Sequence, residues 1–218
     1  MNNMDMDPRY DDLLNALERS GYLRSSEVAS AMRSADRAEF VPEEQKSFAY
    51  EDRPIPIGFD QTSSQPLVVS FMMELLSPKK GDRILDIGTG GGWQAAVLAG
   101  LTGDSGKVIT VERIPELHAF AKGNFERVGL LSSGVVECVL GDASSDIGSD
   151  IVFDRIISAA ETDEVPSVWK NILAVGGRMV VPIRGSLVVA EKIAADRFET
   201  KEYIGFSFMP LVTGRKNK

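Results

Sequence analysis

The feature that most constrains this chain is the glycine-rich run from Leu85 to Gly92, which reads Leu-Asp-Ile-Gly-Thr-Gly-Gly-Gly. It ends an apolar segment typical of a buried strand and precedes an apolar helical segment that starts at Gln94. Glycines permit a tight turn and let a ligand approach the backbone closely. A strand, a glycine turn and a helix in this order predict a nucleotide-type site, with a turn shaped only for packing as the alternative.

Strand-like and helical segments alternate from this turn onwards. The expected strands are Ile84–Ile87, Val108–Val111, Val135–Leu140, Arg155–Ile157 and Met179–Val181, and the helices between them include Gln94–Leu101 and Glu116–Val128. This interval indicates βαβ units, so the sequence predicts an α/β fold with a doubly wound, mostly parallel, Rossmann-like sheet. Ligands of such sheets bind at the carboxyl ends of the strands.

The first third of the chain has a different pattern. Apolar residues at helical spacing predict two N-terminal helices, one containing Tyr10 to Leu17 and one beginning near Ser25 or Ser26. Prolines then bracket the segment from Gly58 to Ser64, which we expect to be a constrained loop. The nearly all-apolar run from Leu67 to Leu76 predicts a buried helix with Pro66 in its first turn.

At the other end, Leu187 to Ile193 and Phe198 to Leu211 form strand-like runs without a helix between them. They predict an antiparallel hairpin at the sheet edge. We therefore expect residues 1–66 to form a helical cap and substrate loop, and residues 67–218 to form a cofactor-binding Rossmann-like domain. The length favours one compact unit.

Composition excludes several classes of partner. With 24 Lys and Arg against 32 Asp and Glu, the formal charge is −8, which gives no footprint for nucleic acid or an anionic membrane. The start of the chain lacks the features of a signal peptide, and no apolar stretch is long enough to span a bilayer. Cys138 and His118 are the only residues of their types, so neither an intramolecular disulfide nor a Cys/His zinc site is expected. We expect a cytoplasmic protein without a metal.

The spacing of the glycines and the acids after them indicate the kind of cofactor. The turn reads G-x-G-x-G, and Trp93 stands where a dinucleotide fingerprint would place its last glycine. Gly106-Lys107 is followed by valine, which excludes a P-loop. Asp86, Glu112 and Asp142 end or follow three successive strands. Their combined negative charge suits a sulfonium and an ammonium better than phosphates, so the sequence favours S-adenosyl-L-methionine.

Three hydroxyl residues, Thr62, Ser63 and Ser64, stand just before Pro66 and the predicted buried helix. A helix N-terminus attracts an anion through its dipole and its unpaired N–H groups. A carboxylate oriented there beside a methyl donor is already ionised at pH 7 and needs no general base. The alternative is that Ser64 or Gln65 only caps the helix.

The chain is similar to the protein-L-isoaspartate O-methyltransferase family from about Arg37 to the Phe208–Leu211 stretch. The hydroxyl loop joined to the glycine turn is the more specific part of this resemblance. The matching segments are Phe40–Glu43, Ala49–Asp52, Pro56–Gly58, Gln61–Pro66, Leu85–Gly92, Gln94–Ala99, Glu112–Leu117, Gly141–Asp142 and Gly176–Arg178.

The resemblance implies methylation of the α-carboxylate of L-isoaspartyl residues in damaged proteins, which starts repair through a succinimide. Thr62 and Ser64 would then hold the substrate carboxylate, so they are the candidate catalytic residues. The candidate cofactor-binding residues are Asp86, Gly88, Thr89, Gly90, Gly92, Glu112, Asp142 and Ala143. A methyltransferase for a different carboxylate and a non-catalytic cofactor-binding protein stay open as alternatives.

Three segments depart from the family pattern. Ser63 replaces the usual isoleucine of the hydroxyl loop, and Ala159–Asp163 carries two acids where the family has a neutral run. Those acids should hinder an anionic substrate. Pro182–Leu187 is shorter than the family's segment and lacks its glutamine. Substrate selection is where these differences would act.

Overall fold

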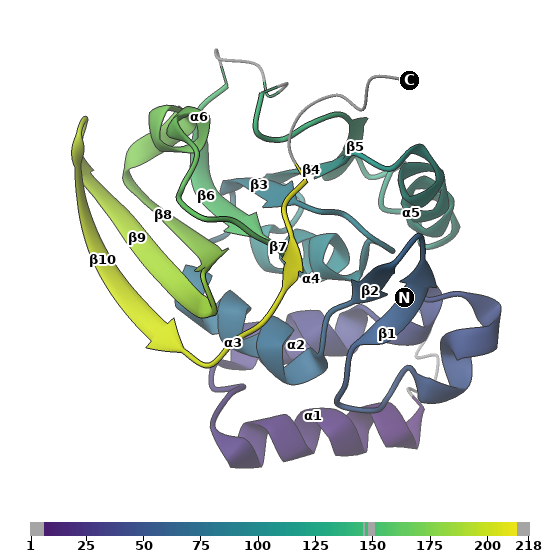
Figure 1. Cartoon of the computed structure of the whole chain (residues 1–218). Coiled ribbons are helices and arrows are strands. Elements are labelled where there is room, and N and C mark those ends of the chain that lie inside the picture. The colour runs from purple at the N-terminus through teal and green to yellow at the C-terminus, as the bar shows by residue number, and fades with distance from the viewer. Residues whose placement is uncertain (1–6, 146, 148–150, 213–218) are drawn as a thin grey trace.

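The computed structural model describes residues 7–145, 147 and 151–212 (Figure 1). The outer ends of the two expected units, residues 1–6 and 213–218, therefore lie outside the described residues. The first third of the described chain contains α1 (Pro8–Ser20), α2 (Ser26–Ser34), the 3-10 helices η1 (Arg37–Phe40) and η2 (Glu43–Phe48), β1 (Ile55–Gly58), β2 (Gln61–Ser63) and α3 (Pro66–Leu76). Both predicted N-terminal helices and the buried helix after Pro66 are confirmed.

A seven-stranded sheet forms the centre of the protein, in the order β10-β9-β8-β6-β3-β4-β5. Its strands are β3 (Arg83–Ile87), β4 (Lys107–Glu112), β5 (Val136–Leu140), β6 (Phe153–Ser158), β8 (Leu173–Ile183), β9 (Ser186–Ala194) and β10 (Arg197–Ile204). The five strands from β8 to β5 are parallel, and β8, β9 and β10 pair antiparallel. The predicted α/β fold, with a mostly parallel sheet and a C-terminal antiparallel hairpin, is confirmed.

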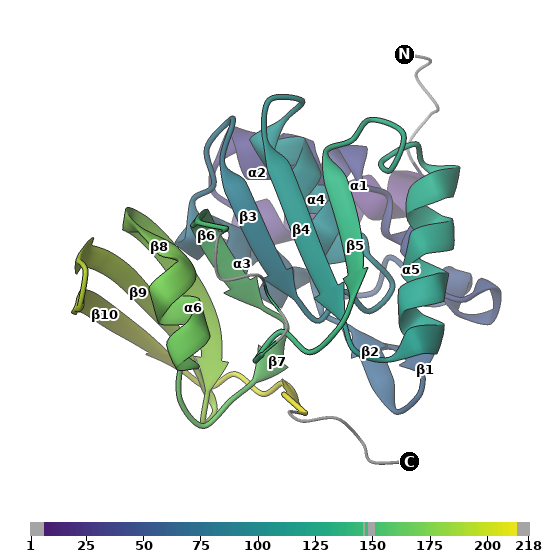
Figure 2. The ribbon, with the colours of Figure 1, turned by 90° about the horizontal axis from the view of Figure 1, so that it is seen from above.

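Helices cover both faces of this sheet (Figure 2). The helices that follow the glycine turn are α4 (Trp93–Thr102), α5 (Pro115–Arg127) and α6 (Ser167–Ile172). The sequence pattern did not predict the short α6. Alternate residues of a strand point to opposite faces, so Ile84 packs with α3 and α4, whereas Leu85 packs with Trp169 of α6. No helix within the described ranges is long and apolar enough to cross a membrane.

The two N-terminal helices extend the core on one face of the sheet. Helix α2 packs on α4, and α1 packs on α2, so their apolar residues join the same buried cluster as the sheet residues. Three hydrogen bonds from two side chains fix them further. The hydroxyl of Tyr10 donates to the carbonyl oxygens of Met32 (2.7 Å) and Ala35 (3.0 Å), and the indole N–H of Trp93 donates to Ala35 (2.9 Å).

The expected loop from Gly58 to Ser64 is instead part of a β-hairpin. Strands β1 and β2 pair antiparallel, and Phe59 and Asp60 between them both have positive φ, at 55° and 57°. The sequence pattern did not predict this hairpin because its turn lacks the Asn-Gly or Asp-Gly pair that usually marks such hairpins. Pro56 is compatible with β1 because proline is tolerated in edge strands.

We propose that the cap and the sheet unfold as one unit, because they share a core. Tyr10→Phe removes a buried hydrogen bond and should lower the free energy of unfolding by about 0.5–1.5 kcal/mol. Urea titrations followed by circular dichroism and by tryptophan fluorescence should give one coincident transition in both the wild type and the variant. Two separate transitions would contradict a shared core.

Candidate functional site

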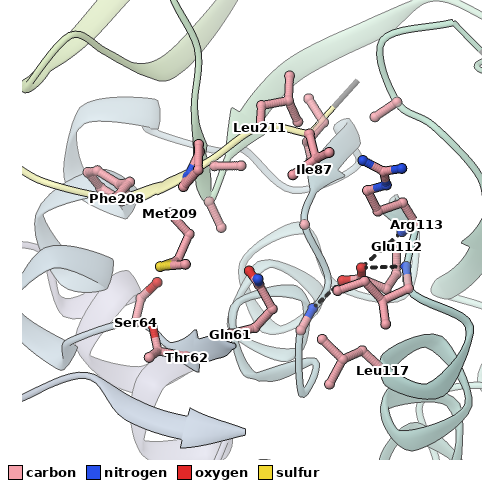
Figure 3. Close-up of a pocket in the computed structure, with 18 of the residues that line it drawn as sticks. Gln61, Thr62, Ser64, Ile87, Glu112, Arg113, Leu117, Phe208, Met209 and Leu211 are labelled. Carbon is pink, nitrogen blue, oxygen red and sulfur yellow. Dashed lines mark hydrogen bonds between the residues drawn. The ribbon is translucent and has the colours of Figure 1, made fainter. Parts of the chain in front are cut away.

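A cavity of about 370 Å³ opens at the carboxyl edge of the parallel strands (Figure 3). The glycine turn, the end of β4, the segment after β5, the hydroxyl loop and the C-terminal segment form its walls. Of the residues predicted from the sequence, it is lined by Thr62, Ser64, Gly88, Gly90, Glu112, Asp142 and Ala143. The predicted residues Asp86, Thr89 and Gly92 do not line the cavity.

Glu112 holds the glycine turn against the end of β4. The residue is 6% exposed, and its carboxylate accepts hydrogen bonds from the N–H groups of Gly90, Arg113 and Ile114, each at 2.9 Å (Figure 3). Because an ionised carboxylate has about four acceptor positions, it can still accept a hydroxyl from a ligand.

Gly90 and Gly91 show why glycines are needed here. Gly90 has φ +55°, and a Cβ on it would lie 3.2 Å from Ile57 Cδ1. A Cβ on Gly91 would lie 2.0 Å from the carbonyl oxygen of Phe40, which is the last residue of η1. The turn is therefore packed against the N-terminal segment, while Gly90 faces the cavity.

Asp86 supports the turn from below and is fully buried. It accepts hydrogen bonds from Gln94 Nε2 and Thr110 Oγ1, both at 2.7 Å. Since the Thr110 hydroxyl donates to Asp86, it accepts from the hydroxyl of Thr89, which is 2.6 Å away. Burial raises the pKa of Asp86 to about 6, and the two donated hydrogen bonds oppose that rise. This network fixes the conformation of the turn.

The segment after β5 forms another wall of the cavity. The Asp142 carboxylate accepts the backbone N–H and the hydroxyl of Ser144 at 2.8 and 2.6 Å, and the Trp169 indole donates to the Ala143 carbonyl at 2.7 Å. The Gly141 N–H donates to the Glu112 carbonyl at 2.9 Å. Both cofactor candidates in this segment therefore have a fixed backbone.

In the hydroxyl loop, Thr62 and Ser64 line the cavity, whereas Ser63 between them is buried on the other side. The N-cap of α3 is Gln65, which makes no side-chain capping bond and donates instead to Asp52 at 3.1 Å. Among the described residues, neither the Thr62 nor the Ser64 hydroxyl has a hydrogen-bond partner. Helix capping therefore does not account for Ser64, and both hydroxyls are available to a ligand.

Sequence patterns missed the C-terminal wall of the cavity. Strand β11 (Met209–Pro210) pairs in parallel with β7 (Ala160–Glu161), and the Leu211 N–H donates to the Glu161 carbonyl at 2.6 Å. The Met209 side chain thereby points towards Ser64 (Figure 3). Two-residue strands carry no periodicity, so the strand-like run from Phe198 to Leu211 did not predict this pairing with β7.

Two of the segments that differ from the family pattern, Ala159–Asp163 and Pro182–Leu187, contact each other beside β7. Thr162 pairs with Ile183, and its N–H donates to the Pro182 carbonyl at 3.0 Å. Asp163 lies 3.7 Å from Arg184 in an ion pair whose partners are 91% and 74% exposed. Such an exposed pair contributes little stability, but it partly offsets the charge of one of the two acids.

The cavity fits the cofactor that the sequence favours. Its volume lies within the usual range for a small-molecule site, and apolar side chains such as Val111, Ile114 and Leu117 supply a surface for an aromatic base. The fixed carboxylate of Glu112 repels a phosphate at this position but attracts a cation. The fold and the site together define a Rossmann-like methyltransferase of the class that uses S-adenosylmethionine.

Comparison with known proteins identifies the family within this class. The family model "Protein-L-isoaspartate(D-aspartate) O-methyltransferase (PCMT)" matches residues 8–216. The protein-L-isoaspartate O-methyltransferase of Aeropyrum pernix is 42% identical over 204 residues, covering 92% of this chain and 78% of the relative. That of Methanopyrus kandleri is 39% identical, covering 92% and 89%. The chain belongs to the protein-L-isoaspartate O-methyltransferase family.

Solved structures agree with this assignment. A protein-L-isoaspartate O-methyltransferase that is 29% identical superposes with a TM-score of 0.82, covering 94% of this chain and 66% of the other. A candidate enzyme of the same name from Plasmodium falciparum, 24% identical, gives a TM-score of 0.83 and covers 93% and 98%. Its crystal structure is a complex with S-adenosyl-L-homocysteine, and at this identity the likeness shows the fold alone.

The buried Asp86 predicts a specific pH dependence of stability. Its pKa is about 6 in the folded protein against an ordinary 3.8, so the folded state binds its proton first as the pH falls. Its contribution to the free energy of unfolding is complete below the unfolded pKa and is lost as the pH rises through the folded one. Asp86→Asn removes this contribution.

The difference in unfolding free energy between wild type and Asp86→Asn should therefore increase in favour of the wild type from about pH 7 to about pH 4. Urea denaturation at several pH values measures that difference, and contributions of titrating groups that do not interact with Asp86 cancel in it. A difference that stays constant with pH would show that Asp86 does not titrate in this range.

Proposed function

We propose that this protein methylates the α-carboxylate of L-isoaspartyl residues in damaged peptides and proteins, with S-adenosyl-L-methionine as methyl donor, and so initiates their repair. The observation that carries this proposal is one cavity with the hydroxyls of Thr62 and Ser64, which have no partner among the described residues, on one wall and the Gly88–Gly90 turn with Glu112 on another. Family membership supplies the substrate class.

The cofactor-binding residues follow from their place in the cavity. Glu112 would accept hydrogen bonds from ribose hydroxyls, Gly88 and Gly90 would lie against the cofactor, and Asp142 and Ala143 would lie near the adenine. Asp86, Thr89 and Gly92 act from outside the cavity, because they shape the turn rather than line it. When bound, S-adenosylmethionine supplies an electrophilic methyl group on a positively charged sulfur.

The chain's own residues have to bind and aim a carboxylate. The hydroxyls of Thr62 and Ser64 donate hydrogen bonds to it at the N-terminus of α3, where the helix dipole favours an anion. A carboxylate is ionised at pH 7, so no residue has to remove a proton. Positioning is then the main contribution of the protein, and Met209 with its neighbours in the C-terminal segment limits access of water from one side.

Ser64→Ala tests this assignment with Ser63→Ala as the matched control, since Ser63 is the neighbouring hydroxyl that faces away from the cavity. Loss of a hydrogen bond to a charged group should lower kcat/KM about 10- to 150-fold in Ser64→Ala, whereas Ser63→Ala should stay within about threefold. The assay measures methyl transfer to an isoaspartyl peptide and to its aspartyl twin, and only the first should be methylated.

The same assay separates the alternatives. Methylation of a different carboxylate, with none on the isoaspartyl peptide, would identify a relative with a changed substrate. Cofactor binding by calorimetry without any methyl transfer would identify a binding protein. Equal kcat/KM in the wild type and Ser64→Ala on the isoaspartyl peptide would reject the role of Ser64 alone.

A further inference from the structure

Arg37, the first residue of η1, is a fully buried cation outside the cavity. No carboxylate lies within 4.0 Å of it in the described part of the chain. Its two terminal nitrogens donate instead to five backbone carbonyls, those of Ala49 (3.2 Å), Glu51 (3.1 Å), Arg53 (3.0 Å), Ser63 (3.2 Å) and Ser64 (2.8 Å). Burial lowers its pKa to about 10, so it stays charged at neutral pH.

Two of these acceptors belong to the hydroxyl loop. The carbonyls of Ser63 and Ser64 point to the guanidinium, while the side chain of Ser64 lines the cavity. A buried carbonyl that loses its donor costs about 1–3 kcal/mol, so the loop would rearrange if the guanidinium were removed. The conformation that presents Ser64 to the cavity therefore depends on Arg37.

The other side of Arg37 contacts the cofactor turn. Its guanidinium lies 5.1 Å from the ring centre of Trp93, the residue that follows Gly92 and begins α4. The end of the same 3-10 helix is in contact with the turn as well, since the Phe40 carbonyl occupies the space of a Cβ on Gly91. Helix η1 therefore contacts both the cofactor turn and the hydroxyl loop.

We propose that Arg37 is a positioning residue that holds the Ser63–Ser64 backbone at a fixed place relative to the cofactor turn. It acts through the loop and touches neither ligand. The inference rests on the proposed function, because it takes the carboxylate to bind at Thr62 and Ser64. Loss of Arg37 should therefore impair use of the carboxylate substrate far more than binding of the cofactor.

Lysine cannot replace Arg37 in this role. An ammonium keeps the charge but presents its three donors from one point, whereas the planar guanidinium reaches acceptors on two separate segments. Arg155→Lys is a control for the loss of a buried guanidinium, because Arg155 is also buried (8% exposed) and donates to the backbone carbonyls of Ser77 and Asp154, although it also pairs with Asp82 at 3.5 Å. Arg155 lies near the start of β6, away from the carboxyl edge that carries the cavity.

Arg37→Lys should lower kcat/KM for the isoaspartyl peptide by about 10-fold or more, while the Kd for S-adenosylhomocysteine changes by less than about threefold. Arg155→Lys should leave both within about threefold. Hydrogen exchange measured by mass spectrometry should be faster in residues 61–65 of Arg37→Lys, with residues 86–92 unchanged. A residue that only stabilised the fold would not lower kcat/KM for the peptide while leaving the Kd for S-adenosylhomocysteine unchanged.

Three results would overturn the proposal. The first is an unchanged kcat/KM in Arg37→Lys, and the second is a loss of cofactor affinity as large as the loss of kcat/KM. The third is failure of this conservative variant to fold, which would make Arg37 a requirement of the fold as a whole. If the wild type does not methylate the isoaspartyl peptide, the proposed function fails, but hydrogen exchange still decides the matter. Faster exchange confined to residues 61–65 supports Arg37 as the residue that holds the loop, and uniform exchange rejects it.

Discussion

The hydrogen bond from the Gly90 amide to the Glu112 carboxylate joins the ends of two neighbouring parallel strands. It fixes where the glycine turn leaves β3 and, through the same carboxylate, how the chain leaves β4. Both strands end at the carboxyl edge of the sheet, and the chain turns away from that edge after each of them. The space between the two turns stays open and forms the cavity. The hydroxyl loop and the C-terminal segment then enclose that space.

Acids of similar chemistry have different roles here because of their depth. Asp86 is fully buried outside the cavity and accepts hydrogen bonds from Gln94 and Thr110, so it holds the turn in shape and does not reach a ligand. Glu112, at the end of the next strand, lines the cavity and keeps acceptor capacity for a hydroxyl. On the other side of the turn, Arg37 donates hydrogen bonds to carbonyl oxygens rather than to carboxylates. Hydrogen bonds from backbone groups to Glu112, and from Arg37 to backbone carbonyls, therefore fix the glycine turn and the hydroxyl loop relative to each other.

Much of this arrangement was predictable from the sequence. Strand and helix periodicity in the Rossmann-like region is strong, and a glycine turn followed by Glu112 and Asp142 indicates which edge carries the ligand. Periodicity cannot predict which acid is enclosed, because Gln94 and Thr110 reach Asp86 only in the folded protein. It also missed the β1–β2 hairpin, whose turn at Phe59 and Asp60 lacks the usual glycine, and β11, whose two residues are held by a distant partner strand.

One cavity is expected to bring a substrate carboxylate and a methyl donor together. A crystal structure of the protein with S-adenosylhomocysteine and an isoaspartyl peptide would show both ligands in place. We expect the α-carboxylate in hydrogen-bond contact with the hydroxyls of Thr62 and Ser64, and the cofactor's ribose on Glu112. A carboxylate bound elsewhere, or a ribose that does not contact Glu112, would contradict this expectation.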